Sequence, residues 1–368
     1  MNDTVMMKSL ADVCDILDSQ RIPVTARDRV KGCYPYYGAN GIQDYVDKYI
    51  FDDELVLLAE DGGNFGSKES PIAYRVSGKC WVNNHAHVLK PHDNTDVDYL
   101  CYALMFYNTE GLVNGATRQK LTQSAMKKMI IPLCDLKRQQ EIVNELNAVS
   151  HLISLRQRQA EKLDELVKAR FVEMFGEGKY GGNPLSNVCK LITDGTHQPP
   201  QFVDAGIPFL LVSNLVHNEI TYDTEKFISK ESYQELIKRT PVEIGDILLS
   251  IVGSYGHAGV VRTDKPFCFQ RHIAYIKPDF SKLNSEFLHY ALLSDAVKYQ
   301  MEKRVKGIAQ KTLNLSELKK IVVPIPPLAL QTEFSHFVHE VDREKERIQR
   351  SAALLETLKR SLMQQYFG

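Results

Sequence analysis

Polar loops in both halves of this chain carry side chains that can form two hydrogen bonds at once. Arginine can pair in this way with guanine, and asparagine or glutamine with adenine, in the major groove of duplex DNA. Histidine, lysine and hydroxyl side chains can add contacts to bases or phosphates. These loop residues predict a surface that reads base edges. In the first half they are Tyr36, Asn40, Asn64, Lys68, Asn83, Asn84, His85, Arg118 and Gln119. In the second half they are Thr196, His197, Gln198, Ser213, Asn214, Ser254, Tyr255, His257, Arg271, His272, Gln310 and Lys311.

Two histidines suggest a second kind of chemistry. His85 and His87 alternate in the sequence NNHAH, so they share one face of an expected strand and could bind a metal with a distant carboxylate. No third ligand lies at a suggestive spacing, so we expect no metal site. His85 aligns with His272 when NNHAHVLKP is laid on FQRHIAYIKP. A histidine at one place in both halves favours a base or phosphate contact, with a structural histidine at a turn as the alternative.

The elements that must position these loops occur twice. Gly115 to Gly176 aligns without a gap on Gly307 to Gly368, at an offset of 192 residues (307 − 115). Each copy holds a short β-branched run stopped by a proline, Pro132 or Pro324, which is typical of a strand that ends there. A duplication of this length predicts two similar halves rather than a solenoid of short repeats.

After the proline, apolar residues recur in steps of three and four over several heptads. This spacing predicts the seam of a coiled coil, so we expect one long helix in each copy and packing of the two helices on each other. Arg156 and Arg170 interrupt the first seam, and Lys345 and Lys359 the second. These basic residues either specify the register or extend out of the seam into water. The apolar seam positions are Ile142, Leu146, Val149, Ile153, Leu163, Val167, Phe334, Val338, Val341, Ile348, Leu355 and Leu362.

The remaining sequence predicts two small domains of the α+β class. Short alternating or β-branched runs between Gly, Asn, Asp and Pro indicate antiparallel strands and turns, and a short helix follows in each half. We expect two such domains, each a mixed sheet with short helices, joined by two long antiparallel coiled-coil helices with a pseudo-two-fold internal repeat. The expected boundaries are 1–134 for domain one, 135–176 for helix one, 177–326 for domain two and 327–368 for helix two.

Composition restricts the class of protein. A chain of 368 residues is long enough for two or three domains with a core in each. No apolar stretch approaches the roughly 20 residues of a membrane span, and the first residues do not form a signal peptide. Seven scattered cysteines without a CxxC pair favour a reducing, cytoplasmic location. The net charge of −1 is far from that of an autonomous DNA-binding domain, although basic residues cluster in the loops.

The chain lacks the sequence motifs of several enzyme classes. The chain has no GxxxxGK[ST] phosphate loop, and QPPQ at Gln198 to Gln201 is not the proline-aromatic motif of an adenine methyltransferase. A hydrolase that uses Ser254 and His257 in GSYGH is one alternative function. A protein-interaction scaffold, in which the coiled coil is the function, is another. The hydrolase predicts turnover by the isolated chain, and the scaffold predicts no sequence-specific DNA binding.

The whole pattern resembles a known family. The segments YPYYGANG, YIFDDELVLLAEDGGNFG and VNNHAHVLKP precede an I-I-P turn and a long heptad helix, and the same plan is repeated. This order is similar to that of the specificity subunit of type I restriction-modification systems, and the similarity covers essentially the whole chain. In the first copy, Cys134 and Asp135 replace two prolines of the family's turn.

The resemblance implies a DNA-binding protein without catalytic activity. Two target recognition domains would each read half of an asymmetric bipartite site in double-stranded DNA, and two helices would set the spacer. The helices would also dock two methyltransferase subunits, which support the restriction and translocase subunits. No cofactor is expected in this chain, because S-adenosylmethionine and ATP would bind the partner subunits.

Overall fold

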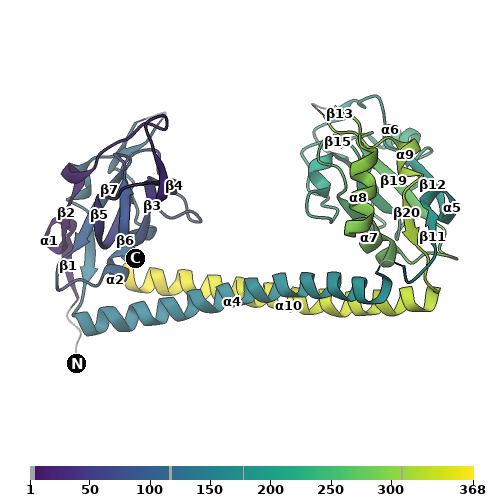
Figure 1. Ribbon diagram of the computed structural model, residues 1–368. Helices are drawn as coiled ribbons and strands as arrows, with labels where there is room; N and C mark the ends of the chain where they lie inside the picture. Colours follow the sequence, from purple (N-terminus) through teal and green to yellow (C-terminus); the bar gives the residue numbers. More distant parts are fainter. Residues whose placement is uncertain (1–4, 116–117, 177, 308–309) are drawn as a thin grey trace. The chain divides into compact units, whose positions relative to one another are not determined.

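A computed structural model describes residues 5–115, 118–176, 178–307 and 310–368. Contacts divide the chain into two compact units. Unit 1 holds residues 1–157 with Arg350–Gly368, and unit 2 holds Arg158–Gln349. Figure 1 labels the main elements of both units. Each unit therefore combines one domain with half of each long helix, whereas the four-part division expected from the sequence stays a prediction.

Unit 1 is built on a six-stranded sheet with the order β2-β7-β5-β6-β3-β4. All neighbours pair antiparallel except β3 and β6, which are parallel. The strands of this sheet are β2 (Cys14–Ile16), β3 (Lys31–Gly38), β4 (Gly41–Val46), β5 (Phe51–Ala59), β6 (Ala73–Val82) and β7 (Ala86–Pro91). The other elements are β1 (Met6–Ser9), α1 (Leu10–Val13), η1 (Asp18–Gln20), α2 (Val97–Met105), β8 (Val113–Asn114), β9 (Lys120–Leu121), α3 (Gln123–Met126) and β10 (Ile130–Leu133).

Unit 2 has a four-stranded antiparallel sheet with the order β12-β19-β16-β17, which matches β2-β7-β5-β6 of unit 1. A second small sheet, β13-β15-β14-β18, replaces the β3–β4 hairpin. The strands are β11 (Gly182–Pro184), β12 (Cys189–Asp194), β13 (Phe202–Val203), β14 (Ile207–Leu210), β15 (Phe227–Ile228), β16 (Ile247–Ser250), β17 (Ala258–Val260), β18 (Cys268–Phe269), β19 (Ile273–Pro278) and β20 (Val322–Pro324). The helices are α5 (Leu185–Val188), η2 (Val212–Leu215), α6 (Lys230–Leu236), α7 (Ser285–Leu293), α8 (Asp295–Arg304) and α9 (Leu315–Leu318).

The central strand of each sheet is buried on both faces. Val56 and Leu58 of β5 pack into the core that includes α2, while Leu55 and Leu57 pack into a second core on the opposite face. In β16, Leu249 packs into the core that includes α7, and Leu248 packs into a second core on the opposite face. Successive side chains of a strand point to opposite faces, so a continuous apolar run is what a strand covered on both sides requires.

The duplicated segment folds in the same way twice. Helices α4 (Leu136–Phe175) and α10 (Leu328–Phe367) each have 40 residues, and their bounds differ by the sequence offset of 192. The preceding short helices α3 and α9 show the same offset, and β1 pairs with β10 as β11 pairs with β20. The two long helices expected from the sequence repeat are therefore present at matching positions.

The long helices pack together within each unit. In unit 2, Phe171 and Phe175 of α4 surround Phe334 of α10 with ring centroids 5.5 and 5.6 Å apart. In unit 1, the hydroxyl of Tyr366, near the end of α10, donates a hydrogen bond to Glu145, near the start of α4, at 2.5 Å. All the predicted apolar seam residues are buried or half-buried. This pairing of the start of one helix with the end of the other confirms an antiparallel arrangement.

Two basic residues of the seam pair with acids on the opposite helix. Lys345 of α10 binds Asp164 of α4 at 2.7 Å, and Arg170 of α4 binds Glu333 of α10 at 3.2 Å. Such pairs favour one alignment of the two helices, although their partial exposure limits how much each stabilises the fold.

A buried glutamine joins each long helix to its domain. Gln139 accepts a hydrogen bond from the backbone of Asp96, the N-cap of α2, and donates to the carbonyls of Asn94 and Cys134. Gln331, at the same place in the repeat, makes the corresponding bonds to Asn284, Lys282 and Pro326. Both glutamines are fully buried.

We expect Gln139→Ala to lower the free energy of unfolding by about 2–4 kcal/mol, because three backbone groups lose the hydrogen bonds of a fully buried side chain. Urea denaturation of the full chain measures this. The control is Gln140→Ala on the exposed face of the same turn, which should change the value by less than about 0.5 kcal/mol. Equal effects of the two substitutions would contradict the role of the buried side chain.

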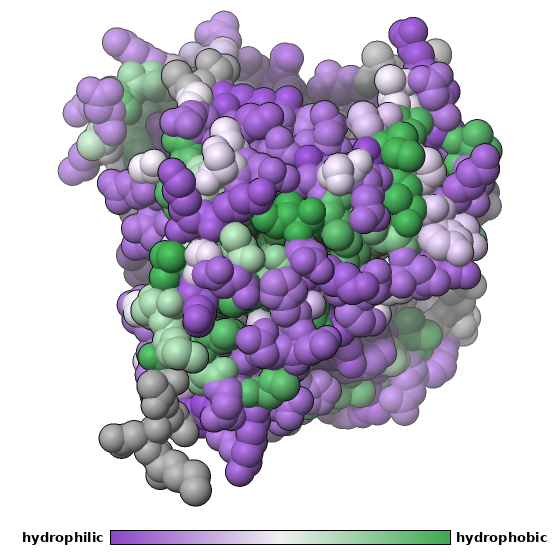
Figure 2. All heavy atoms as spheres, turned by 90° about the vertical axis from the view of Figure 1, so that its left-hand side faces the viewer, coloured by the Kyte–Doolittle hydropathy of each residue, from purple (hydrophilic) through white to green (hydrophobic). Residues whose placement is uncertain are grey.

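The face shown in Figure 2 is mainly hydrophilic, with apolar side chains scattered among polar ones. Such a surface is typical of contact with water or with another polar molecule. Among the residues described, no helix combines the length and the apolar character needed to cross a lipid bilayer.

Candidate nucleic-acid interface

In unit 1, three segments meet at the end of the sheet where β5 ends and β7 begins. The backbone N–H of Glu60 donates to the carbonyl of His85 at 2.8 Å, and Gly62 donates to Gln119 at 3.1 Å. Leu121 donates in turn to Glu60 at 2.7 Å. These bonds hold the loop after β5, the loop before β7 and the start of the repeated segment side by side.

Unit 2 builds the same frame from matching residues. Ile251 donates to His272 at 2.9 Å, Gly253 donates to Lys311 at 2.8 Å, and Leu313 donates to Ile251 at 2.8 Å. The alignment of His85 with His272, expected from the sequence, therefore holds in three dimensions.

The side chains on this frame differ between the units. Asp61 of unit 1 corresponds to Val252 of unit 2, and Arg118 corresponds to Gln310, because the matched backbone bonds fix the alignment. A constant backbone that presents different polar groups suits two domains that recognise different chemical patterns.

Most of the predicted contact residues of unit 1 lie in these loops and are at least partly exposed. Asn40, at the turn between β3 and β4, donates to the carbonyl of Gly62 at 3.0 Å, which brings that turn to the same place. The ones that are exposed or half-exposed are Asn40, Asn64, Lys68, Asn84, His85, Arg118 and Gln119.

In unit 2, the loop after β12 is hydrogen-bonded to the segment before β19. The backbone N–H of Thr196 donates to the carbonyl of Phe269, and the N–H of Arg271 donates to the carbonyl of Thr196. Burial lowers the pKa of His272, and the charge of Arg271 adds to the effect, so its ring is neutral near pH 7. The predicted residues that are exposed or half-exposed are Thr196, His197, Gln198, Ser213, Ser254, Tyr255, His257, Arg271, His272, Gln310 and Lys311.

Three predicted contact residues are corrected by the structure. Tyr36 is 1% exposed, and its hydroxyl hydrogen-bonds the backbone of Val24. Asn83 is 3% exposed; its oxygen accepts from the backbone of His85, and its amide donates to Gln43. Asn214 is 6% exposed and bonds the backbone around Thr221. Their polar groups are used inside the domain, so these residues are buried structural residues and not exposed loop side chains.

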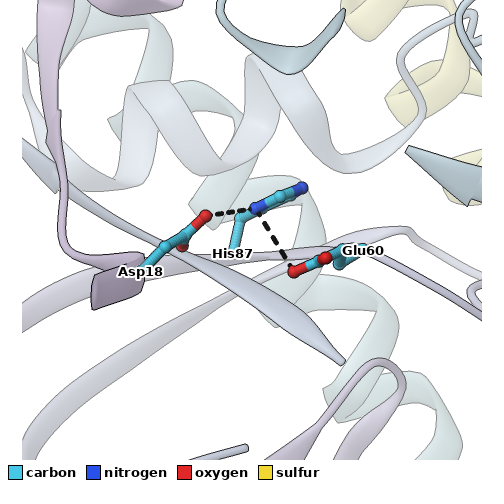
Figure 3. A group of neighbouring side chains, drawn as sticks. All are labelled: Asp18, Glu60 and His87. Carbon is cyan, nitrogen blue, oxygen red and sulfur yellow. Dashed lines mark hydrogen bonds and ion pairs between the residues drawn. The ribbon is translucent and has the colours of Figure 1, made fainter. Parts of the chain in front are cut away.

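A buried ion network beneath the loops of unit 1 was not expected. His87 lies between Asp18 and Glu60 in Figure 3, with its Nδ1 at 2.6 Å from Asp18 and 3.7 Å from Glu60. Its Nε2 faces the carbonyl of Leu121 at 2.9 Å. Burial raises the pKa of Asp18, but the hydrogen bond and charge of His87, with help from Arg21, lower it overall.

The ligand atoms of Asp18, Glu60 and His87 lie within 4.8 Å of one another, which is close enough to hold a metal ion. However, Arg21 already contacts both carboxylates, at 2.7 Å from Glu60 and 3.6 Å from Asp18. A guanidinium group therefore supplies the positive charge that a cation would bring. His85, which the sequence places beside His87, is not part of this group, because its Nδ1 binds Asp61.

The residues of the alternative hydrolase do meet. Ser254 Oγ lies 3.1 Å from His257 Nε2, and His257 Nδ1 lies 3.2 Å from Asn218. Burial, with the charges of Lys298 and His217, lowers the pKa of His257. An amide in place of the third carboxylate cannot stabilise an imidazolium by its charge, so the geometry gives little support to this alternative.

A glycine at the start of the repeated segment lies close to the backbone of Arg118. Gly115 has a φ of 105°, and a Cβ there would lie 2.3 Å from the carbonyl oxygen of Arg118. We expect Gly115→Ala to displace Arg118 and weaken binding to the recognised DNA about tenfold or more in the assembled complex. The matched control is Gly111→Ala, since Gly111 also has a positive φ but a Cβ there would meet no atom within 4 Å. If Gly115→Ala left the affinity for DNA unchanged, this segment would not be part of the DNA interface.

Comparison with known proteins decides the family. The sequence model of the type I restriction modification DNA specificity domain matches residues 2–165 and 188–356, one match in each half. The chain belongs to this family. A type I restriction enzyme specificity subunit of Haemophilus influenzae is 30% identical over 344 residues, which cover 89% of this chain and 85% of the relative. The MjaVIII specificity subunit of Methanocaldococcus jannaschii is 21% identical over 384 residues, which cover 93% of this chain and 88% of the relative.

Solved structures support the same fold. The specificity subunit of the type I system from M. genitalium aligns over 100% of this chain and 97% of its own, with 16% identity and a TM-score of 0.54. A second structure, described as the basis of complex assembly and conformational transition of a type I system, aligns over 100% of this chain and 98% of its own. The identity is 16% and the TM-score is 0.61. As a type I specificity subunit, the protein is a non-catalytic component that recognises DNA.

Proposed function

We propose that each unit reads one half of a bipartite sequence in double-stranded DNA. The observation that carries the proposal is the repeated loop frame, which presents different side chains in the two units on one backbone. Two similar but chemically different readers on one chain suit a site with two unlike halves. The base-reading candidates are the exposed and half-exposed loop residues named above.

The long helices set the distance between the half-sites and dock two methyltransferase subunits. Besides the buried seam, each helix carries exposed leucines, including Leu155 and Leu166 on α4 and Leu354 and Leu358 on α10. Exposed leucines at helical spacing are suited to packing against partner helices. Because the helices repeat, two copies of one partner can bind. Restriction and translocase subunits join through the methyltransferases.

The partners also supply what this chain lacks in charge and cofactors. With a net charge of −1, it neutralises few phosphates by itself, so the partner subunits provide much of the phosphate contact. S-adenosylmethionine and ATP bind in those partners. The cysteines of the described residues are all free thiols, which supports a cytoplasmic complex.

Sequencing of methylated bases in cells tests the proposal. A strain that makes this chain with its methyltransferase subunit should methylate one bipartite motif, and deletion of this gene alone should abolish that methylation. The protein-interaction scaffold makes the opposite prediction, since no motif would then depend on the chain. Methylation that persists after deletion would contradict the proposed function.

A further inference from the structure

An aspartate at the loop end of unit 1 holds an arginine and a histidine together. Oδ1 of Asp61 accepts hydrogen bonds from Arg118 Nη2 at 2.9 Å and from His85 Nδ1 at 2.5 Å. The guanidinium lies against Gly62, where a Cβ would be 3.2 Å from Arg118 Nε. The Asp61 side chain is 19% exposed, whereas that of Arg118 is 59% exposed. The arginine is thus fixed on its inner side and open on its outer side.

Unit 2 contains the same arrangement at a different position. Asp194, the last residue of β12, accepts from Arg239 Nη2 and, at 2.9 Å, from His197 Nε2. The Asp194 side chain is 10% exposed and that of Arg239 is 52% exposed. β12 ends beside the start of β19, because Asp194 pairs with Ala274, so this trio belongs to the same loop end as His272. Arg239 follows α6 and was not among the candidates from the sequence.

We propose that Arg118 and Arg239 each read a guanine, one in each half-site, and that Asp61 and Asp194 are the positioning residues that hold them. This inference rests on the proposed function and specifies which residues carry the specificity. A guanidinium has five N–H donors, so one bond to a carboxylate leaves a pair free for O6 and N7 of guanine. An arginine already held in place loses little conformational freedom on binding.

The charge of the two aspartates supports this assignment. An uncompensated carboxylate on a DNA-binding surface repels phosphates and weakens binding to every sequence. In both units the carboxylate is instead paired with an arginine and bonded to a histidine. A surface that only needed positive charge would do better without the aspartates. Their presence is explained if the orientation of the guanidinium matters more than the number of charges.

The test replaces each arginine by lysine, which keeps the charge but loses the two-donor geometry. Full-length chains with Arg118→Lys or Arg239→Lys are assembled with the methyltransferase subunits and offered a duplex library with randomised half-sites. Each substitution should reduce the preference for guanine roughly ten- to a hundredfold at one base pair of its own half-site. The other half-site should stay unchanged, so each variant is the control for the other.

Asp61→Asn and Asp194→Asn test the positioning role. Each should relax the same base pair as its arginine variant and at the same time increase affinity for unrelated DNA, because a negative charge is lost. A residue that merely stabilised the domain would lower binding to all sequences together with the melting temperature.

The inference is overturned if guanine preference persists in both lysine variants, or if their affinity falls equally for all sequences, as expected of phosphate contacts. The proposed function fails in a different way, since the unmodified complex would then select no bipartite sequence at all.

Discussion

A chimaera that receives residues 10–121 from a relative of different specificity is expected to recognise the donor's half-site in place of its own. The second half-site and the spacer should remain unchanged. Methylated-base sequencing of a strain carrying the chimaera measures all three properties at once.

The expectation follows from the separate construction of the units. The sheet of unit 1 has its own cores on both faces, and no strand of unit 2 pairs with it among the residues described. The exchange must preserve the contact of Tyr99 with Phe367, because the end of α10 packs into the core of unit 1. A donor with an aromatic residue at position 99 is therefore required.

The shorter exchange of residues 10–110 is the informative control. It leaves Arg118 and Gln119 from the original chain within a foreign domain, although they belong to the same loop frame. We expect this variant to keep one base pair of the original half-site. A change in both half-sites with either exchange would contradict independent reading.

The sequence predicts the parts of this molecule that repeat. Helix bounds follow from the heptad pattern, because a coiled-coil seam is a local and periodic signal. The strands β5 and β16 follow from apolar runs between turn residues. By contrast, Asp61 and Arg118 are 57 positions apart in the sequence, and no local sequence pattern predicts that they are in contact.

The candidate site was predicted by residue type and loop position, which do not reveal burial. Tyr36 and Asn83 lie close in sequence to loops that contact DNA in the proposal, yet their own polar groups are satisfied internally. Arg239 follows a short helix between two predicted strands and carries no signal of its own. The pairing of β12 with β19 brings Asp194 to the loop end of unit 2, and the ion pair with Asp194 holds Arg239 there.

The second large effect concerns the spacing of the half-sites. The boundary between the units falls after Gln157 in α4 and after Gln349 in α10, which are matched positions of the repeat. Inserting four residues at both places lengthens each helix by about 6 Å and keeps the apolar face nearly in phase, since four residues are close to one turn.

If the helices set the spacer, this double insertion should select DNA in which the half-sites lie one or two base pairs further apart, because each base pair adds about 3.4 Å along a strand. The bases recognised within each half should not change. Insertion into α4 alone is the control, because the two helices then differ in length. The Lys345–Asp164 and Tyr366–Glu145 contacts, which lie on opposite sides of the insertion point, cannot then both form, and assembly should weaken. A double insertion that keeps full activity at the original spacing would show that something other than these helices fixes the distance.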